Sequence, residues 1–194
     1  MLIVLEMSKI FYLKEIVGYF TIITMVHMIF SPIYHEMGHA RQIKKIGGEA
    51  LVTIHSSFSL KNIYFKYKKV CVFISNDDRI HTCTYEKENY TAYTDQQIKK
   101  IAMAGPVNTF KYLCIISGFS AIGLFINLQA FKENIIIAIM YDIIYMIESK
   151  QDCKKDSFND FAIKKNPTAF REHVQQTTDT YEEINKIIKE LIKK

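Results

Sequence analysis

The chain has 194 residues, the length of one ordinary domain, and its net charge at pH 7 is +5. Its mean hydropathy of +0.01 is high for a chain with 23% charged residues, which indicates that apolar and charged residues lie in separate segments. The basic residues flank apolar runs and the four cysteines form no Cys-x-x-Cys pair, so we expect neither a nucleic-acid partner nor a cysteine zinc site.

The first apolar run, residues 16–34, contains no charged side chain. A helix of about 20 apolar residues crosses the hydrocarbon of a bilayer, so we expect a transmembrane helix here. Residues 1–15 are apolar but interrupted by charges, and they predict a lead-in helix at the membrane interface. No small-residue cleavage site follows the apolar run, so we expect no removable signal peptide.

An HExxH motif, His35-Glu36-Met37-Gly38-His39, follows this run directly. Side chains four residues apart lie on one face of a helix, so His35 and His39 can offer imidazole nitrogens to one Zn²⁺. Glu36 lies beside the open metal position, where a carboxylate can accept a proton from water. The motif therefore predicts a zinc site with Glu36 as its general base.

The helix that carries the motif is expected to end at Gly47-Gly48, a good C-terminal cap. Its last turns contain Arg41, Lys44 and Lys45, which the positive-inside rule places at a cytoplasmic boundary. We therefore expect the zinc site to face the cytoplasm, roughly one to two helical turns inside the membrane boundary.

Residues 50–94 have a different character, because apolar and polar residues alternate there in several short runs. This period-two pattern predicts strands, and residues 76–79 predict the turn of a β-hairpin. We expect the small sheet mainly to pack, although its edge can hold an extended substrate by strand addition. His55 and His81 are expected to be ordinary strand residues.

Two further apolar segments, residues 101–126 and 133–147, are joined by a short connection and predict an antiparallel pair of transmembrane helices. Together with residues 16–34 they predict a mainly α, polytopic membrane protein with about three transmembrane helices. A small β-hairpin element is expected between the first and second helices. The C-terminal residues predict a cytoplasmic helix, because apolar side chains recur there at helical spacing with lysines on the other face.

The HExxH motif is followed by Ala104-Gly105-Pro106 with Asn108 nearby, and by an aspartate after the third apolar segment. This combination resembles the site-2 protease family, whose members are intramembrane zinc metalloproteases. The resemblance implies that His35, His39 and a distant aspartate bind Zn²⁺. It also implies that Glu36 is the base and that Asn108 contacts the substrate.

The second motif departs from the family pattern. The family places an asparagine three residues after the proline, whereas Asn108 comes two residues after Pro106. Thr109 stands at the position where the family has asparagine. The expected substrate contact of Asn108 therefore rests on its nearness to the motif.

The third metal ligand is chosen from three aspartates. The family's Asn-x-x-Pro segment is absent and its Asp-Gly pair becomes Asp156-Ser157. Asp156 is our choice, because the run Asp-Ser-Phe-Asn most resembles the family's aspartate motif. Asp160 is the next choice, and Asp142 is retained because its depth in the third apolar segment matches that of the histidines.

The domain organisation that follows is a membrane-embedded metalloprotease-like core over residues 1–163 and an amphipathic cytoplasmic tail over residues 164–194. The core includes the β-rich insertion at residues 50–94. We expect an integral membrane protein of a bacterial plasma membrane, with the active site toward the cytoplasm. Its oligomeric state is left open.

The expected function is zinc-dependent hydrolysis of a peptide bond in a membrane-associated protein or peptide precursor, near the cytoplasmic face. The expected partners are that substrate and the lipid bilayer, and no nucleic acid. One alternative is a catalytically degenerate relative that serves as a binding or accessory subunit in peptide maturation or export. Another is an HExxH peptidase whose apolar helices form a core.

Overall fold

The computed structural model describes residues 29–57, 61–88, 90, 92–125, 140, 143–144, 147, 159–176 and 181–193. Residues 29–45, here called the motif helix, form the first described helix. The elements after it are β1 (Ala50–His55), β2 (Ile63–Tyr67), β3 (Val70–Ser75), β4 (Cys83–Glu86), α2 (Asp95–Phe125), α4 (Asp160–Lys165), α5 (Pro167–Gln176) and α6 (Tyr181–Ile192).

The strands form a four-stranded mixed sheet in the order β2-β3-β1-β4. β1 runs parallel to β3 and antiparallel to β4, while β2 pairs with β3 in antiparallel fashion. The two central strands, β1 and β3, are rich in buried Val, Ile and Phe, as expected for strands covered on both faces. The predicted hairpin turn at residues 76–79 is wrong, because β3 and β4 lie on opposite sides of β1 and do not pair with each other.

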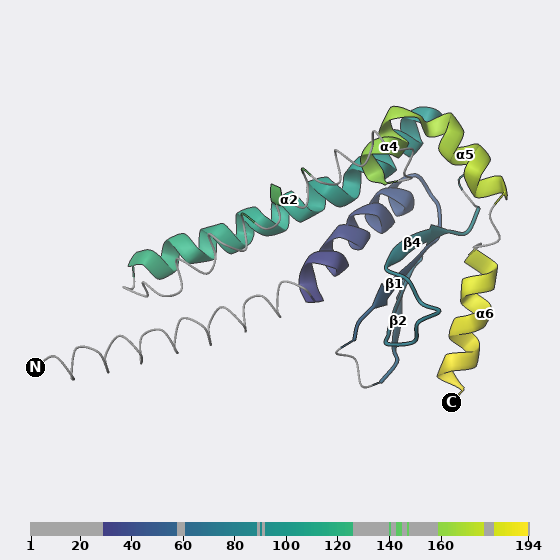
Figure 1. Cartoon of the computed structure of the whole chain (residues 1–194), viewed down its shortest axis with the longest axis horizontal. Coiled ribbons are helices and arrows are strands. Elements are labelled where there is room, and N and C mark those ends of the chain that lie inside the picture. Colours follow the sequence, from purple (N-terminus) through teal and green to yellow (C-terminus); the bar gives the residue numbers. More distant parts are fainter. Residues whose placement is uncertain are drawn as a thin grey trace, which may run out of the picture.

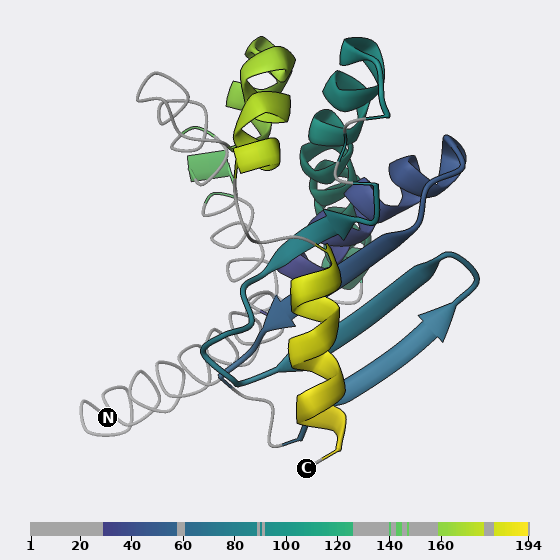
Figure 2. The ribbon, with the colours of Figure 1, turned by 90° about the vertical axis from the view of Figure 1, so that its right-hand side faces the viewer.

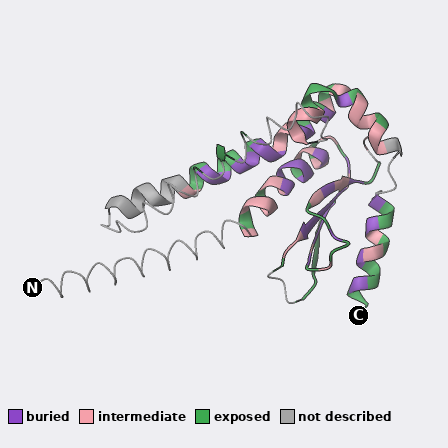
Figure 3. Ribbon diagram, in the orientation of Figure 1, coloured by how far each residue is buried: buried purple, intermediate pink, exposed green. Residues whose placement is uncertain are grey.

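Helices cover both faces of the sheet, as Figures 1 and 2 show. The motif helix packs on one face, where Ala40 and Ile43 lie in one apolar cluster with Val52 of β1. α6 packs on the other face, where Ile188 joins Phe73 of β3 in a second cluster. Because alternate residues of a strand point to opposite faces, both central strands can supply both clusters. Figure 3 shows that the buried side of α6 faces the sheet.

α2 lies on the side of the motif helix that faces away from the sheet, so the motif helix is between α2 and the sheet (Figure 1). The two helices approach closely at Gly38, where an added Cβ would lie 2.8 Å from both the carbonyl carbon of Ala104 and the Cβ of Asn108. Nearby, the rings of Tyr34 and Tyr112 stack with centroids 4.6 Å apart. The close crossing brings the Gly105-Pro106 segment of α2 against the HExxH motif.

The prediction of a mainly helical, polytopic membrane protein is wrong for the part of the chain that the structure describes. Within those residues, no helix combines the length and the apolar character needed to cross a membrane, and the sheet is larger than the predicted hairpin element. α2 covers the predicted second span up to residue 125, and Lys111, which lies within that span, is costly in hydrocarbon. The predicted location as an integral membrane protein rests on the same helices and is therefore also wrong for the described residues. The other two predicted spans, 16–34 and 133–147, lie largely outside the described residues.

Candidate metal centre

The motif helix presents His35 and His39 on one face, as their spacing predicts. Their ring centroids lie 5.0 Å apart and the ring planes are inclined by 72°. His39 is buried and His35 is partly exposed, so the pair lies at the wall of a cleft. The local part of the predicted site is therefore formed by a single regular helix.

Each imidazole is oriented by a partner at Nδ1. Nδ1 of His39 donates to the carbonyl oxygen of Ile101 over 2.7 Å, and Nδ1 of His35 lies 3.0 Å from Oγ1 of Thr109. Both partners belong to α2. A carbonyl oxygen can only accept, so Nδ1 of His39 carries a proton and Nε2 is the nitrogen that can bind a metal. Such partners of metal-binding histidines fix the ring orientation and the tautomer.

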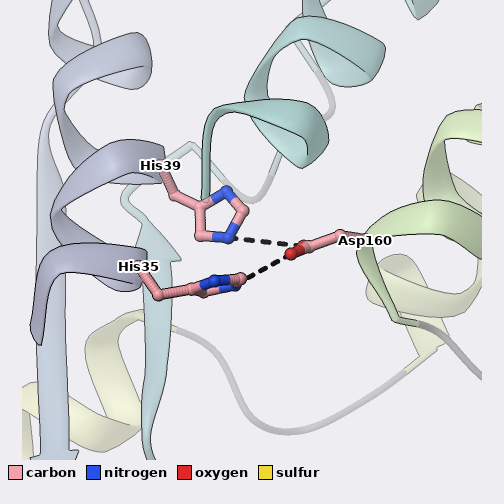
Figure 4. Close-up of side chains that lie close together, drawn as sticks. All are labelled: His35, His39 and Asp160. Carbon is pink, nitrogen blue, oxygen red and sulfur yellow. Dashed lines mark ion pairs between the residues drawn. The ribbon is translucent and has the colours of Figure 1, made fainter. Parts of the chain in front are cut away.

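Asp160 completes a group of three possible metal ligands (Figure 4). Its carboxylate oxygens lie 2.8 Å from Nε2 of His35 and 3.3 Å from Nε2 of His39. Zn–N and Zn–O bonds of about 2.0–2.2 Å in a tetrahedron separate neighbouring ligand atoms by roughly 3.3–3.5 Å. The two distances from the Nε2 atoms involve different oxygens of Asp160, and the candidate ligand atoms of the three residues all lie within 4.8 Å of one another. Nitrogen and carboxylate ligands suit Zn²⁺.

Asp160 owes its position to the start of α4. The side chain of Asn159 caps this helix by accepting hydrogen bonds from the backbone N–H groups of Phe161 and Ala162. α4 lies against α2. α5 is tied to the beginning of α2 by Arg171, which donates to Asp95 over 2.7 Å. The third ligand therefore reaches the histidines through helix packing and not through the sequence near the motif.

The charges of the three residues are coupled. Burial opposes protonation of His39, but the hydrogen bond and negative charge of Asp160 outweigh it and raise the pKa of His39 to about 9. Burial likewise opposes ionisation of Asp160, but hydrogen bonds from His35 and His39 lower the pKa of its carboxyl to about 2. The metal-free site therefore holds a proton near neutral pH, which a metal ion must displace.

Gly105 has no side chain, and the imidazoles of His35 and His39 occupy the space where one would lie. A Cβ built at this position would lie 2.7 Å from Nε2 of His35 and closer still to the ring of His39. Any side chain here would push against the two metal-binding nitrogens. The Gly-Pro segment singled out in the sequence thus lies directly against the site.

Glu36 lies in the same cleft and is buried. Its Oε2 accepts a hydrogen bond of 2.7 Å from Oγ1 of Thr84 on β4. The cleft has a volume of about 580 Å³ and runs between β4, the motif helix, α2, α4 and α5. A further carboxylate that lines it, Glu86, accepts hydrogen bonds from the hydroxyl of Tyr93 at 2.8 Å and from the backbone N–H of Glu88, so it has a structural role.

The structure brings together some of the predicted site residues and separates another. His35, His39 and Glu36 share the cleft with Asp160, which was the second choice for third ligand. Asp156, our first choice, and Asp142 lie outside the described residues. His81, expected to be an ordinary strand residue, lies before β4 and lines the cleft.

Asn108 does not line the cleft. It is buried between the two helices, where its Nδ2 donates to the carbonyl oxygen of Tyr34 and its Oδ1 accepts from Arg41 over 3.3 Å. The neighbouring Thr109 contacts His35 instead. A signal for Thr109 was present in the sequence, since it stands three residues after Pro106, where the family pattern has its polar residue.

The arrangement is a candidate three-ligand metal site with an adjacent carboxylate. In comparisons with family models, curated proteins and solved structures, nothing matches this chain. The resemblance to the site-2 proteases therefore stays a prediction.

Proposed function

We propose that the protein is a zinc-dependent peptidase whose metal is held by His35, His39 and Asp160. The observation that carries this proposal is the convergence of three metal-binding atoms beside a buried glutamate, with both Nδ1 atoms held by α2. Three protein ligands leave one position of a tetrahedral zinc ion for water or substrate, as catalytic zinc sites require.

In the proposed mechanism the metal ion and the side chains of the protein have separate roles. When bound, Zn²⁺ supplies Lewis-acid chemistry, because it polarises a carbonyl and makes water more acidic. Glu36 accepts the proton of the attacking water and returns it to the leaving amine. Thr109 and Ile101 hold the imidazoles in the orientation that the site needs.

β4 is an edge strand of the described sheet and lines the cleft. The backbone N–H of Lys87 donates to the carbonyl oxygen of Glu49, and Val52 is the register partner of Thr84. Hydrogen-bonded and non-bonded pairs alternate along an antiparallel ladder, so the backbone N–H and C=O of Thr84 point away from β1. An extended peptide can therefore pair with β4 by strand addition beside Glu36.

The walls of the cleft favour apolar side chains in that peptide. Phe161, Phe170 and Val174 line it from α4 and α5, and no Lys or Arg lines the described part of the cleft. An acidic substrate side chain would lose hydration there without gaining an ion pair with a Lys or Arg of the described lining. We therefore propose an extended peptide with apolar residues near the scissile bond as the substrate class.

The test is zinc analysis of the purified chain together with digestion of a mixture of short peptides, read by mass spectrometry. Wild type and Glu36→Gln should bind equal amounts of zinc, and cleavage should fall by about 100-fold or more in the variant. A chelator should abolish cleavage and added zinc should restore it. Equal cleavage by Glu36→Gln would refute the catalytic role, and bound zinc without cleavage by the wild type would favour the non-catalytic alternative.

A further inference from the structure

The hydroxyl of Thr84 occupies an unusual place between two oxygen atoms of one residue. Oγ1 of Thr84 lies 2.7 Å from Oε2 of Glu36 and 3.0 Å from the backbone carbonyl oxygen of Glu36. Thr84 and Glu36 are both buried. A hydroxyl has one proton, so this proton is shared between the carboxylate and the carbonyl. The contact joins the edge strand β4 to the motif helix at the glutamate.

We infer that Thr84 is a positioning residue for Glu36, and this inference rests on the proposed peptidase function. By holding Oε2 against the backbone of the motif helix, Thr84 fixes the rotamer of the glutamate. Oε1 is then the oxygen that takes the proton from water. Proton transfer requires the base within hydrogen-bond reach, so loss of this restraint slows the chemical step more than it weakens substrate binding.

The backbone of the same residue supports the inference. The carbonyl oxygen of Thr84 points away from β1 and accepts a hydrogen bond of 3.1 Å from the hydroxyl of Tyr90, which uses one of its two lone pairs and leaves the other for a peptide that pairs with β4. A peptide that pairs with β4 is therefore positioned along the strand by the backbone of Thr84, the same residue whose side chain holds Glu36. Thr84 thereby aligns the scissile bond and Glu36 with respect to each other.

The test compares kcat, KM and bound zinc in full-length Thr84→Val, which keeps the shape without the hydroxyl, and Thr84→Ser, which keeps the hydroxyl. Thr84→Val should retain zinc and a KM within about twofold, while kcat falls at least about tenfold. Thr84→Ser should recover kcat to within about threefold of wild type. Wild-type kcat in Thr84→Val, or equally low kcat in both variants, overturns the inference.

Thr53→Val is the matched control. Thr53 is a buried threonine on the neighbouring strand, and its hydroxyl donates to the carbonyl oxygen of His81 over 2.5 Å without contacting Glu36. This variant should lower stability and leave kcat per folded molecule unchanged. If Thr84→Val does not fold, Thr84→Ala gives the same comparison with Thr84→Ser.

A double-mutant cycle separates this inference from the proposed function. Unfolding by denaturant is measured for the zinc-free wild type, Thr84→Val, Glu36→Ala and the double variant. The change in the unfolding equilibrium constant of the double variant should differ by about fivefold from the product of the changes in the two single variants, because the two side chains interact. Additive effects overturn the inference. Coupling in a protein that cleaves no peptide means that the proposed function fails while the Thr84–Glu36 contact stands.

Discussion

Oγ1 of Thr109 lies 3.0 Å from Nδ1 of His35, while Nε2 of the same imidazole faces Asp160 at 2.8 Å. The hydroxyl thus orients a proposed zinc ligand from the side away from the metal. Thr109→Val should lower zinc affinity by about 10- to 100-fold, because partners of this kind hold the ring and its tautomer. Competition with a chromophoric chelator measures the change, with Thr109→Ser as the control. An unchanged affinity in the valine variant would contradict the orienting role.

Gly105 should tolerate no side chain while the metal site stays intact. In Gly105→Ala the new methyl group would press on the rings of His35 and His39, so bound zinc should be lost while the far-ultraviolet circular dichroism spectrum is retained. Val107→Ala is the control, since Val107 is on the same helix and 47% exposed. Full zinc occupancy in Gly105→Ala would show that the packing around the imidazoles is looser than described.

Asn108 should contribute to stability and not to substrate binding. Asn108→Ala leaves the guanidinium of Arg41 and the carbonyl of Tyr34 without their buried partner, which should lower the free energy of unfolding by about 1–3 kcal/mol. Denaturant unfolding measures this, and KM for a cleaved peptide should stay at the wild-type value. A large rise in KM without loss of stability would restore the predicted substrate contact.

Zinc affinity should rise with pH up to about pH 9. Asp160 raises the pKa of His39 from 6.5 to about 9, so between these values the metal-free protein carries a proton that zinc must displace. The apparent affinity should therefore increase about tenfold per pH unit between pH 7 and 9, after correction for zinc hydrolysis. In metal-free Asp160→Asn the pKa of His39, followed by NMR, should fall below about 9, because the negative charge that holds the proton is gone. A flat wild-type profile would contradict the coupling.

The residues that could be predicted from the sequence are those linked by local periodicity. His35 and His39 are one helical turn apart, and alternation marked β1 and β2, so these features follow from spacing alone. Asn108 and Thr109 show the limit of this reasoning, because one residue turns a helical side chain by about 100°, from the cleft to the helix interface.

Non-local features required the structure. Asp156 and Asp160 are four residues apart in the sequence, and packing of α4 against α2 brings Asp160 to the histidines. Asn159, a good helix cap directly before Asp160, was the available signal that a helix begins there. The apolar run of residues 101–126 contains one charge, Lys111, and a single charge does not separate a membrane span from a helix packed in a core, because both are rich in apolar residues.

The central claim, that His35, His39 and Asp160 bind zinc, is tested most directly by the zinc content of two variants. Asp160→Ala and Asp156→Ala are purified in parallel with the wild type, dialysed against a weak chelator and analysed for zinc by mass spectrometry. The account predicts that Asp160→Ala loses its zinc while Asp156→Ala retains as much as the wild type. Zinc retained by Asp160→Ala and lost from Asp156→Ala would contradict it.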